Sequence, residues 1–319
     1  MTQPSGAPEQ DEPPTGARRW WIVGTSALAV VVAAATVGWS LHRSGQEARP
    51  TPVAAVTSAP PTPTPSRTPL PDVPDRPSDE ALAALPLAFH DAVIGGLLDG
   101  TQVDARNAWT TATPKVPLVP LYAAPDAGAD PVATLSSSVS TVNTPTVTAV
   151  WDRSPGQDGG MVLVSTPSRN RTPGDGGVAT APSATFAWAR AADFTLTGVD
   201  RVVRIDDADS TIAIVRRDGS TETSETARLG TPQDPTPVDT KTYMEANYVD
   251  PQVTYTQGHP ISLTGAHSAT LAGYGGNAAL TALHYYPDPT GSSHGCVRIS
   301  AEMTQALARL PIGTPIEFS

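Results

Sequence analysis

The N-terminal part of the chain combines a long apolar run with a proline-rich stretch, so only residues 78–319 remain to build a globular core. The apolar run extends from Trp20 to Leu41 and contains no charged residue. About 20 apolar residues in a helix cross a hydrocarbon core of roughly 30 Å. Trp20 and Trp39 lie near its two ends, where indole rings favour the membrane interface. We therefore expect residues 20–41 to form a transmembrane anchor.

The stretch 42–77 is rich in proline, threonine, alanine and serine. This composition favours extended polyproline II chain, which acts as a semi-rigid spacer and buries no core. A cytoplasmic tail over residues 1–19, one span, a spacer and then all of the globular mass predict a single-pass type II protein of the cell membrane. Secretion after signal cleavage is the alternative, because Ala33, Ala34 and Ala35 supply small residues at the place where a signal peptide is cut.

Charge and cysteine content narrow the function. The net charge is −11 at pH 7, and no basic cluster interrupts it, so we expect no nucleic-acid partner. Cys296 is the only cysteine, which means that the exported part has no internal disulfide and depends on packing for its stability. An unpaired thiol outside the membrane is open to oxidation, and this favours a chemical role for Cys296 over a packing role.

The remaining residues predict a mainly β protein with two domains. Residues 78–114 are expected to be a helical segment, because Ser78 is a suitable N-cap and apolar residues recur at helical spacing as far as Gly100. Residues 115–196 and 197–319 both contain short strand patterns between turn residues. In 115–196, which predicts a small β domain, the patterns cover 116–122, 146–150, 161–165 and 184–189. In 197–319 they cover 202–206, 211–217, 242–246, 253–256, 261–263 and 314–318, with one helix over 300–310.

The chemistry is concentrated around Cys296. A cysteine nucleophile reacts as the thiolate and needs a nearby base, and histidine, with a pKa near neutrality, is the natural partner. Two candidates are close in sequence, His284 and His294. Gly295 lets a substrate approach the backbone, whose N–H groups at Gly295 and Cys296 would form an oxyanion hole. Arg298 lies on the same side of an extended strand, suited to hold a substrate carboxylate or to raise the thiolate fraction. A zinc site built from these histidines and the cysteine is the structural alternative.

The segment SSHGCVRIS at residues 292–300 resembles the signature of L,D-transpeptidases with the YkuD fold. The strand patterns that begin at Val202, and the Gly-Thr-Pro segment at 230–232, resemble the opening of the same catalytic domain, so the resemblance covers residues 197–319. It implies that Cys296 is the nucleophile and His284 the base, while Ser293, His294 and Gly295 shape the catalytic loop. His294 is counted with the catalytic residues, and Ser293, Gly295 and Arg298 with those that bind substrate. No metal or organic cofactor is implied.

The resemblance also implies a substrate, the tetrapeptide stem of peptidoglycan. The thiol would attack the bond between the third residue, meso-diaminopimelate, and the terminal D-Ala, and a neighbouring stem would accept the acyl group in a 3→3 cross-link. An L,D-carboxypeptidase and an inert scaffold that binds the cell wall are the alternatives. Residues 115–196 loosely resemble the SH3-like modules of bacterial cell-wall proteins, for which wall attachment or packing against the catalytic domain is expected.

Two features depart from the family pattern. The spacer between His284 and Ser293 is short, and Tyr285 follows the first histidine where a small residue is usual. Tyr285 is therefore a candidate for lining the substrate cleft. His267, in the glycine-rich segment TGAHSATLAGYGG, is a second candidate for substrate binding and an alternative base, because such a loop suits the edge of a cleft.

Overall fold

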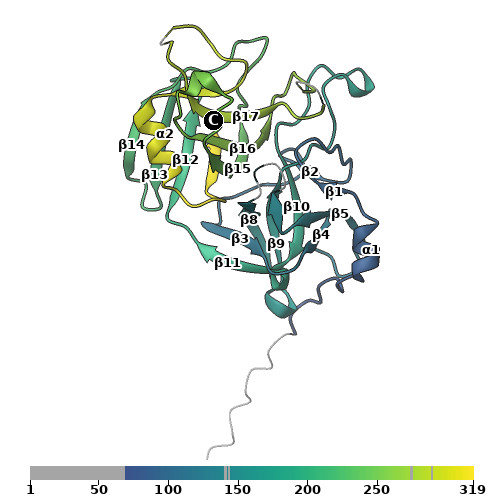
Figure 1. Ribbon diagram of the computed structural model, residues 1–319. Coiled ribbons are helices and arrows are strands. Elements are labelled where there is room, and N and C mark those ends of the chain that lie inside the picture. The colour runs from purple at the N-terminus through teal and green to yellow at the C-terminus, as the bar shows by residue number, and fades with distance from the viewer. Residues whose placement is uncertain (1–68, 140–141, 143, 274–275, 289) are drawn as a thin grey trace, which may run out of the picture. The chain divides into compact units, whose positions relative to one another are not determined.

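The computed structural model describes residues 69–319 except 140–141, 143, 274–275 and 289 (Figure 1). The predicted tail and anchor, and most of the predicted spacer, lie outside the described residues. No helix in the described part of the chain is long and apolar enough to span a membrane. The prediction of a mainly β protein is confirmed, because two large sheets account for most of the regular structure.

Helix α1 is much shorter than the predicted helical segment. It covers Asp79–Ala83, and the Ser78 hydroxyl caps it by accepting the Ala81 N–H at 3.2 Å. Pro86 follows closely, and a proline lacks an N–H and disfavours helical backbone in the residue before it. The chain therefore becomes extended, and Leu87 already pairs with the first sheet. The prediction of a helical segment over residues 78–114 is wrong beyond Ala83.

The first sheet takes nine strands from the described residues, in the order β1-β5-β4-β10-β9-β8-β3-β11, with β2 paired to β10 (Figure 1). The strands are β1 (Leu87–Ala88), β2 (Leu98–Asp99), β3 (Thr110–Pro114), β4 (Leu118–Tyr122), β5 (Pro131–Ser136), β8 (Thr148–Ser154), β9 (Met161–Thr166), β10 (Thr185–Arg190) and β11 (Phe194–Gly198), and a separate pair is β6 (Ser138–Val139) with β7 (Thr144–Pro145). The four predicted strand patterns correspond to β4, β8, β9 and β10. The likeness to SH3-like modules stays a prediction.

The second sheet has the order β14-β13-β12-β19-β15-β16-β17-β18. Its strands are β12 (Arg201–Asp206), β13 (Thr211–Arg216), β14 (Thr221–Thr226), β15 (Thr240–Tyr248), β16 (Ile261–His267), β17 (Leu280–Tyr285), β18 (Val297–Ile299) and β19 (Pro315–Phe318). Short helical turns are η1 (Gln157–Gly159), η2 (Asp175–Gly177), η3 (Ala191–Asp193) and η4 (Thr254–Thr256). The predicted strands at 202–206, 211–217, 242–246, 261–263 and 314–318 are confirmed, and β17 and β18 lie at the end of the sheet.

The predicted strand at 253–256 is wrong, because the chain turns there into η4. The Asp250 carboxylate accepts the Gln252 N–H at 2.8 Å, and the Asp250 carbonyl accepts the Val253 N–H at 3.1 Å. Gln257 and Gly258 follow with φ of 54° and 80°, a left-handed backbone that no strand continues through. The turn leaves the ring of Tyr255 46% exposed.

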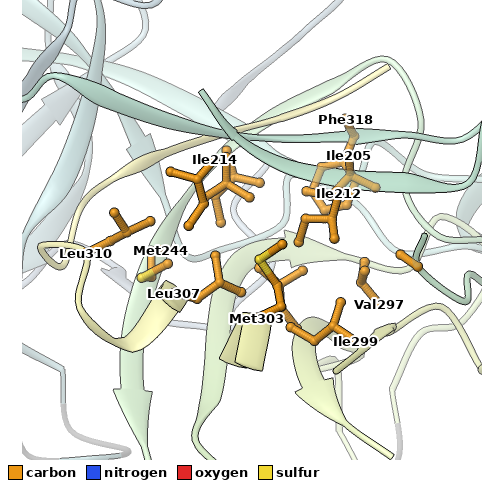
Figure 2. Close-up of a cluster of buried hydrophobic side chains, with 14 of the residues drawn as sticks. Ile205, Ile212, Ile214, Met244, Val297, Ile299, Met303, Leu307, Leu310 and Phe318 are labelled. Atoms are coloured by element: carbon orange, nitrogen blue, oxygen red, sulfur yellow. The ribbon is translucent and has the colours of Figure 1, made fainter. Parts of the chain in front are cut away.

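Helix α2 (Ala301–Ala308) fixes the position of β17 and β18. It begins where predicted, with the Ser300 hydroxyl accepting the Met303 N–H at 3.0 Å. Met303 and Leu307 are one helical turn apart and point into the same buried cluster as Ile205 and Ile212 (Figure 2). Each such side chain contributes about 1.5–3 kcal/mol by leaving water. Because α2 packs on β16 and β17, one face of these two strands is buried in the core.

Strand β15 joins the core of the second sheet to the first sheet. Tyr243 is buried in a cluster whose other members, including Trp151 and Phe186, belong to the first sheet or the segments beside it. Two residues on, Glu245 is 1% exposed, and its Oε2 atom has no hydrogen-bond partner among the described residues. Glu245 lines a cavity of about 80 Å³ that is walled mainly by residues between Leu87 and Pro167. Burial raises the pKa of this carboxyl from its ordinary value of 4.5 to about 8.

This burial predicts a stability that falls as the pH rises. The folded state keeps a proton on Glu245 that the unfolded state releases, so the free energy of unfolding decreases from about pH 4.5 to about pH 8, by about 4 kcal/mol. Glu245→Gln should abolish most of this slope and make the protein more stable than wild type at pH 8. Urea unfolding at pH 5 and pH 8 measures it, with Glu302→Gln on the exposed side of α2 as control. An unchanged slope in Glu245→Gln would contradict the assignment.

Candidate active site

The register of β17 and β18 brings three of the predicted residues onto one face of the sheet. The two strands are parallel, with Leu283 opposite Val297 and His284 opposite Arg298. Leu283 and Val297 belong to the core. Because side chains alternate along a strand, His284 and Arg298 point to the opposite face, and so does Cys296 immediately before β18. The short spacer after His284 therefore still returns the chain to a position beside this histidine.

The thiol of Cys296 is partly buried, and it accepts a hydrogen bond from the backbone N–H of Ala282 on β17. Burial raises the pKa of the thiol, while the Ala282 N–H and the positive charge of Arg298 act in the opposite direction and are weaker. The expectation that Arg298 raises the thiolate fraction is therefore outweighed by burial. The thiol therefore rests protonated, and to act as a nucleophile it would need a base at the moment of attack.

His284 is suited to be this base. Its Nδ1 atom lies 2.9 Å from the carbonyl oxygen of Tyr285, and a carbonyl only accepts, so the proton is assigned to Nδ1 and the lone pair to Nε2. Burial lowers the pKa of the imidazole, the Tyr285 carbonyl raises it, and the charges of Arg298 and Arg228 lower it further. His284 is therefore neutral near pH 7, and the resting pair is thiol and imidazole, both uncharged.

Tyr255 packs against the base, although it was not predicted from the sequence. Its ring lies 5.4 Å from the ring of His284 and 5.5 Å from that of Tyr286, between centroids. Burial raises the pKa of the Tyr255 phenol, and the nearby Cys296 raises it further while Arg298 lowers it. Burial also raises the pKa of the Tyr248 phenol at the end of β15, and Cys296 is among the weaker causes that raise it further. Aromatic side chains thus shield the imidazole from water beside the thiol.

We expect Tyr255→Ala to move the pH dependence of the reaction. Removing the ring exposes His284 to water, so the pKa of the imidazole should rise from its lowered value toward 6.5. The acidic limb of the kcat/KM profile, which requires neutral His284, should then move to higher pH. Tyr255→Phe keeps the ring and should keep the wild-type limb. Equal acidic limbs in the two variants would contradict the shielding role.

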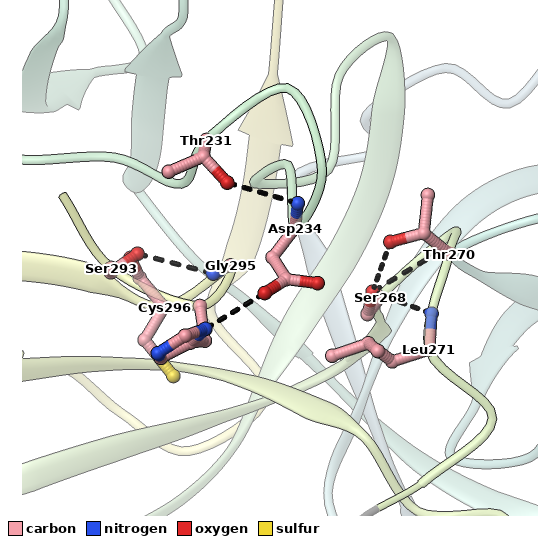
Figure 3. Close-up of polar contacts among 9 residues, drawn as sticks. Thr231, Asp234, Ser268, Thr270, Leu271, Ser293, Gly295 and Cys296 are labelled. Carbon is pink, nitrogen blue, oxygen red and sulfur yellow. Dashed lines mark hydrogen bonds and ion pairs between the residues drawn. The ribbon is translucent and has the colours of Figure 1, made fainter.

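Ser293 and Gly295 set the shape of the loop before Cys296 (Figure 3). The Ser293 hydroxyl donates to the carbonyl of Cys296 and accepts the Gly295 N–H at 3.2 Å. Gly295 has φ of 95°, and a Cβ atom there would lie 3.1 Å from the carbonyl oxygen of Pro235, so the position favours glycine. Because its N–H is donated to Ser293, Gly295 is not a free oxyanion donor in this structure, contrary to the prediction.

His294 contacts Asp234, a residue that the sequence reasoning missed. Its Nδ1 atom lies 2.7 Å from the Asp234 carboxylate, and the histidine side chain is largely exposed (Figure 3). Asp234 belongs to a tight turn in which its N–H donates to the Thr231 hydroxyl at 3.1 Å. The same segment pairs with the motif through Gly230 and Ser293. Among the described residues, no group of three or more His, Cys, Asp or Glu side chains is placed to hold a metal ion.

Arg298 lies over the ring of Tyr286, with 3.9 Å from its guanidinium carbon to the ring centroid. Arg228 approaches the same ring at 5.9 Å and donates to the carbonyls of Tyr286 and Thr290. None of the ion pairs in the described part of the chain involves Arg298, and its Nε atom is buried without a hydrogen-bond partner there. This favours the predicted role of Arg298 in binding a substrate carboxylate.

His267 and Tyr285 are the other two predicted substrate contacts. His267 is 0% exposed, and its Nε2 atom lies 2.7 Å from the carbonyl oxygen of His90, so its predicted roles in substrate binding and as an alternative base are wrong. Burial lowers its pKa to about 3. The ring of Tyr285 lies 4.7 Å from that of His259, between centroids, and is tilted against it. Tyr285 also helps to line a pocket with Arg228 and Arg298, so its place in the substrate cleft stays a prediction.

Comparison with known proteins gives one family. The family model of YkuD, L,D-transpeptidase catalytic domain, matches residues 200–318. A search of curated proteins found no match. Among solved structures, the L,D-transpeptidase of Stackebrandtia nassauensis is similar with 17% identity and a TM-score of 0.27, over 38% of this chain and 55% of that one. The L,D-transpeptidase from Mycobacterium smegmatis has 15% identity and a TM-score of 0.29, over 50% of this chain and 90% of that one. Mycobacterium tuberculosis L,D-transpeptidase 1 has 15% identity and a TM-score of 0.27, over 42% of this chain and 77% of that one.

Proposed function

From the premise that residues 200–318 are an L,D-transpeptidase catalytic domain of the YkuD family, we propose that this chain forms 3→3 cross-links between peptidoglycan stems. The observation that carries the proposal is the neutral His284, whose Nδ1–H is held by the Tyr285 carbonyl on the sheet face that also bears Cys296. A base with a free Nε2 beside a protonated thiol is what acyl transfer through a thioester requires.

The reaction begins with the donor stem. As the Sγ atom of Cys296 attacks the carbonyl carbon of the third residue, Nε2 of His284 takes the thiol proton. The bond to the terminal D-Ala then breaks, the imidazolium returns the proton to the leaving amine, and a thioester remains. The side-chain amine of a neighbouring stem attacks this thioester, a new amide forms, and the thiol recovers a proton. No metal or organic cofactor is required.

Two further groups act on substrate in this proposal. The backbone N–H of Cys296 is the remaining candidate for the oxyanion, because the Gly295 N–H is donated to Ser293. Arg298 binds a carboxylate of the stem peptide. Two observations support this role of Arg298. It has no acidic partner within the described residues, and it helps to line a pocket of about 430 Å³ together with Arg228 and Tyr286.

We propose that residues 20–41 anchor the chain in the cell membrane and that the spacer carries both β domains toward the cell wall. The apolar run and the proline-rich stretch support this arrangement. The substrate, a polymer outside the membrane, is then within reach of the catalytic domain.

Incubation of the full chain in detergent with disaccharide-tetrapeptides, followed by mass spectrometry, tests the function. We expect cross-linked dimers that have lost D-Ala, and none with Cys296→Ala. Disaccharide-tripeptide without dimers would assign an L,D-carboxypeptidase instead. Unchanged tetrapeptide, together with binding to sacculi that does not depend on Cys296, would assign an inert scaffold.

A further inference from the structure

A loop of the second sheet is anchored on a buried arginine that comes from the first domain. The loop, residues 268–279, connects β16 to β17, and Tyr274 and Gly275 within it are outside the described residues. Arg169 follows strand β9 and is 0% exposed, although its side chain carries a charge. No ion pair in the described part of the chain includes this guanidinium. A buried charge without an acidic partner is costly, so its contacts require an explanation.

The guanidinium of Arg169 donates to both arms of the loop. Its Nη2 atom lies 2.6 Å from the carbonyl oxygen of Leu271, and its Nε atom lies 3.1 Å from that of Asn277. A planar fork can reach two carbonyls at once, whereas the single ammonium of a lysine cannot reproduce that geometry. The backbone of Arg169 is fixed in turn, since its N–H donates to Ala92 and its carbonyl accepts from Ile94.

Other hydrogen bonds extend the same contact between loop and first domain. The Asn277 side chain donates to the carbonyl of Asp91 at 3.2 Å, and the Ala181 N–H donates to that of Ala269 at 2.9 Å. At the start of the loop, the His267 N–H donates to the Ser183 carbonyl at 2.7 Å. The first domain thus holds the loop on both sides, at Ala269 and Leu271 and at Asn277, and Arg169 is the one charged donor in this set of bonds.

The far end of this loop leads directly into the active site. The Ser268 N–H donates to the Ala279 carbonyl at 2.8 Å, which closes the loop where β17 begins at Leu280. Two residues further on, Ala282 lies opposite Cys296, since the next residues, Leu283 and Val297, are paired in the register of β17 and β18, and His284 follows on the same strand. A displacement of the loop would therefore move the donor that lowers the pKa of the thiol.

We propose that Arg169 is a positioning residue that holds β17 against Cys296, so that the first domain contributes to the reactivity of the thiol. Only the expected effect of Arg169 on cross-linking rests on the proposed function. Its direct effect is on the thiol and is measurable without any peptidoglycan. The neighbouring Arg171 is exposed, lies on the same segment and provides a matched control.

The test uses the full chain and the rate of Cys296 alkylation by iodoacetamide between pH 6 and pH 10. Arg169→Met should slow alkylation at pH 7 by about three- to tenfold, because a weakened hydrogen bond from Ala282 moves the profile to higher pH. Amide hydrogen exchange should become faster in residues 280–285. Arg169→Lys should give an intermediate profile, and Arg171→Met the wild-type one. Melting temperatures measured in parallel identify the range in which each variant is folded.

Asn277→Ala weakens the same contact from the exposed side of the loop and should shift the profile in the same direction by a smaller amount. If Arg169→Met does not fold, the alkylation profile of Asn277→Ala tests the positioning role instead. A folded Arg169→Met with wild-type alkylation and exchange would overturn the proposal, as would unchanged profiles in both Arg169→Lys and Asn277→Ala. A shifted profile in a chain that forms no cross-links would leave the positioning role standing and refute only the proposed function.

Discussion

Cys296→Ala should abolish cross-linking and leave the protein folded. The thiol is the only one in the chain, so no other side chain can form the thioester. Loss of a nucleophile in a site that works as a unit costs on the order of 10³-fold or more in rate. The resemblance to L,D-transpeptidases further implies that a carbapenem acylates the wild-type thiol. Intact-mass measurement after carbapenem treatment should show one adduct on wild type and none on Cys296→Ala.

The control for this experiment is Cys296→Ser, which keeps the size of the side chain and its polar contact with Ala282. A hydroxyl is far less acidic than a thiol, so this variant should also be inactive while retaining the wild-type melting temperature. An adduct on Cys296→Ala, or cross-linking by it, would show that the reaction does not pass through this residue.

His284→Ala should lower kcat by about 10²- to 10⁴-fold, which is the usual contribution of a general base. The thiol rests protonated because burial raises its pKa, so the variant lacks a group that removes the proton at neutral pH. Its residual activity should rise steadily with pH, as hydroxide creates the thiolate. Added imidazole should restore part of the rate. Single-turnover acylation by a carbapenem, followed from pH 5 to pH 10, measures both effects.

The matched controls are the other histidines near the site. His259→Ala removes a ring that lies 4.7 Å from that of Tyr285, and it should leave the pH profile as in wild type. His294→Ala removes the contact with Asp234 and should have a smaller effect than His284→Ala. A bell-shaped wild-type profile retained in His284→Ala would contradict the assignment of the base.

Local patterns predicted most of the fold. Strand alternation was sufficient for β12 and β13, and Ser300 was sufficient for the start of α2. The predicted helix failed because its apolar spacing continued past Pro86, and the backbone restriction at that proline takes precedence over the spacing. The strand at 253–256 failed for a similar reason, since consecutive left-handed residues at Gln257 and Gly258 follow a turn.

The site could be predicted only where it is local in sequence. Cys296, His284 and Arg298 were found because their motif is compact, and the register of β17 and β18 then placed them together. Asp234 and Tyr255 come from distant segments, and nothing in their own neighbourhoods indicates that they meet His294 and His284. His267 was misjudged because the glycines around it predict an exposed loop, whereas its contact with His90 buries it against another domain.

The raised pKa of the Cys296 thiol also bears on how long the protein survives. Peroxides and other oxidants react with the thiolate far faster than with the thiol, and beyond sulfenic acid the damage is irreversible. The chain has no second cysteine with which to form a protective disulfide. A nucleophile that is deprotonated only when substrate arrives presents little thiolate to oxidants between turnovers. Burial, which lowers the reactivity of the resting thiol, thus also protects it from oxidation.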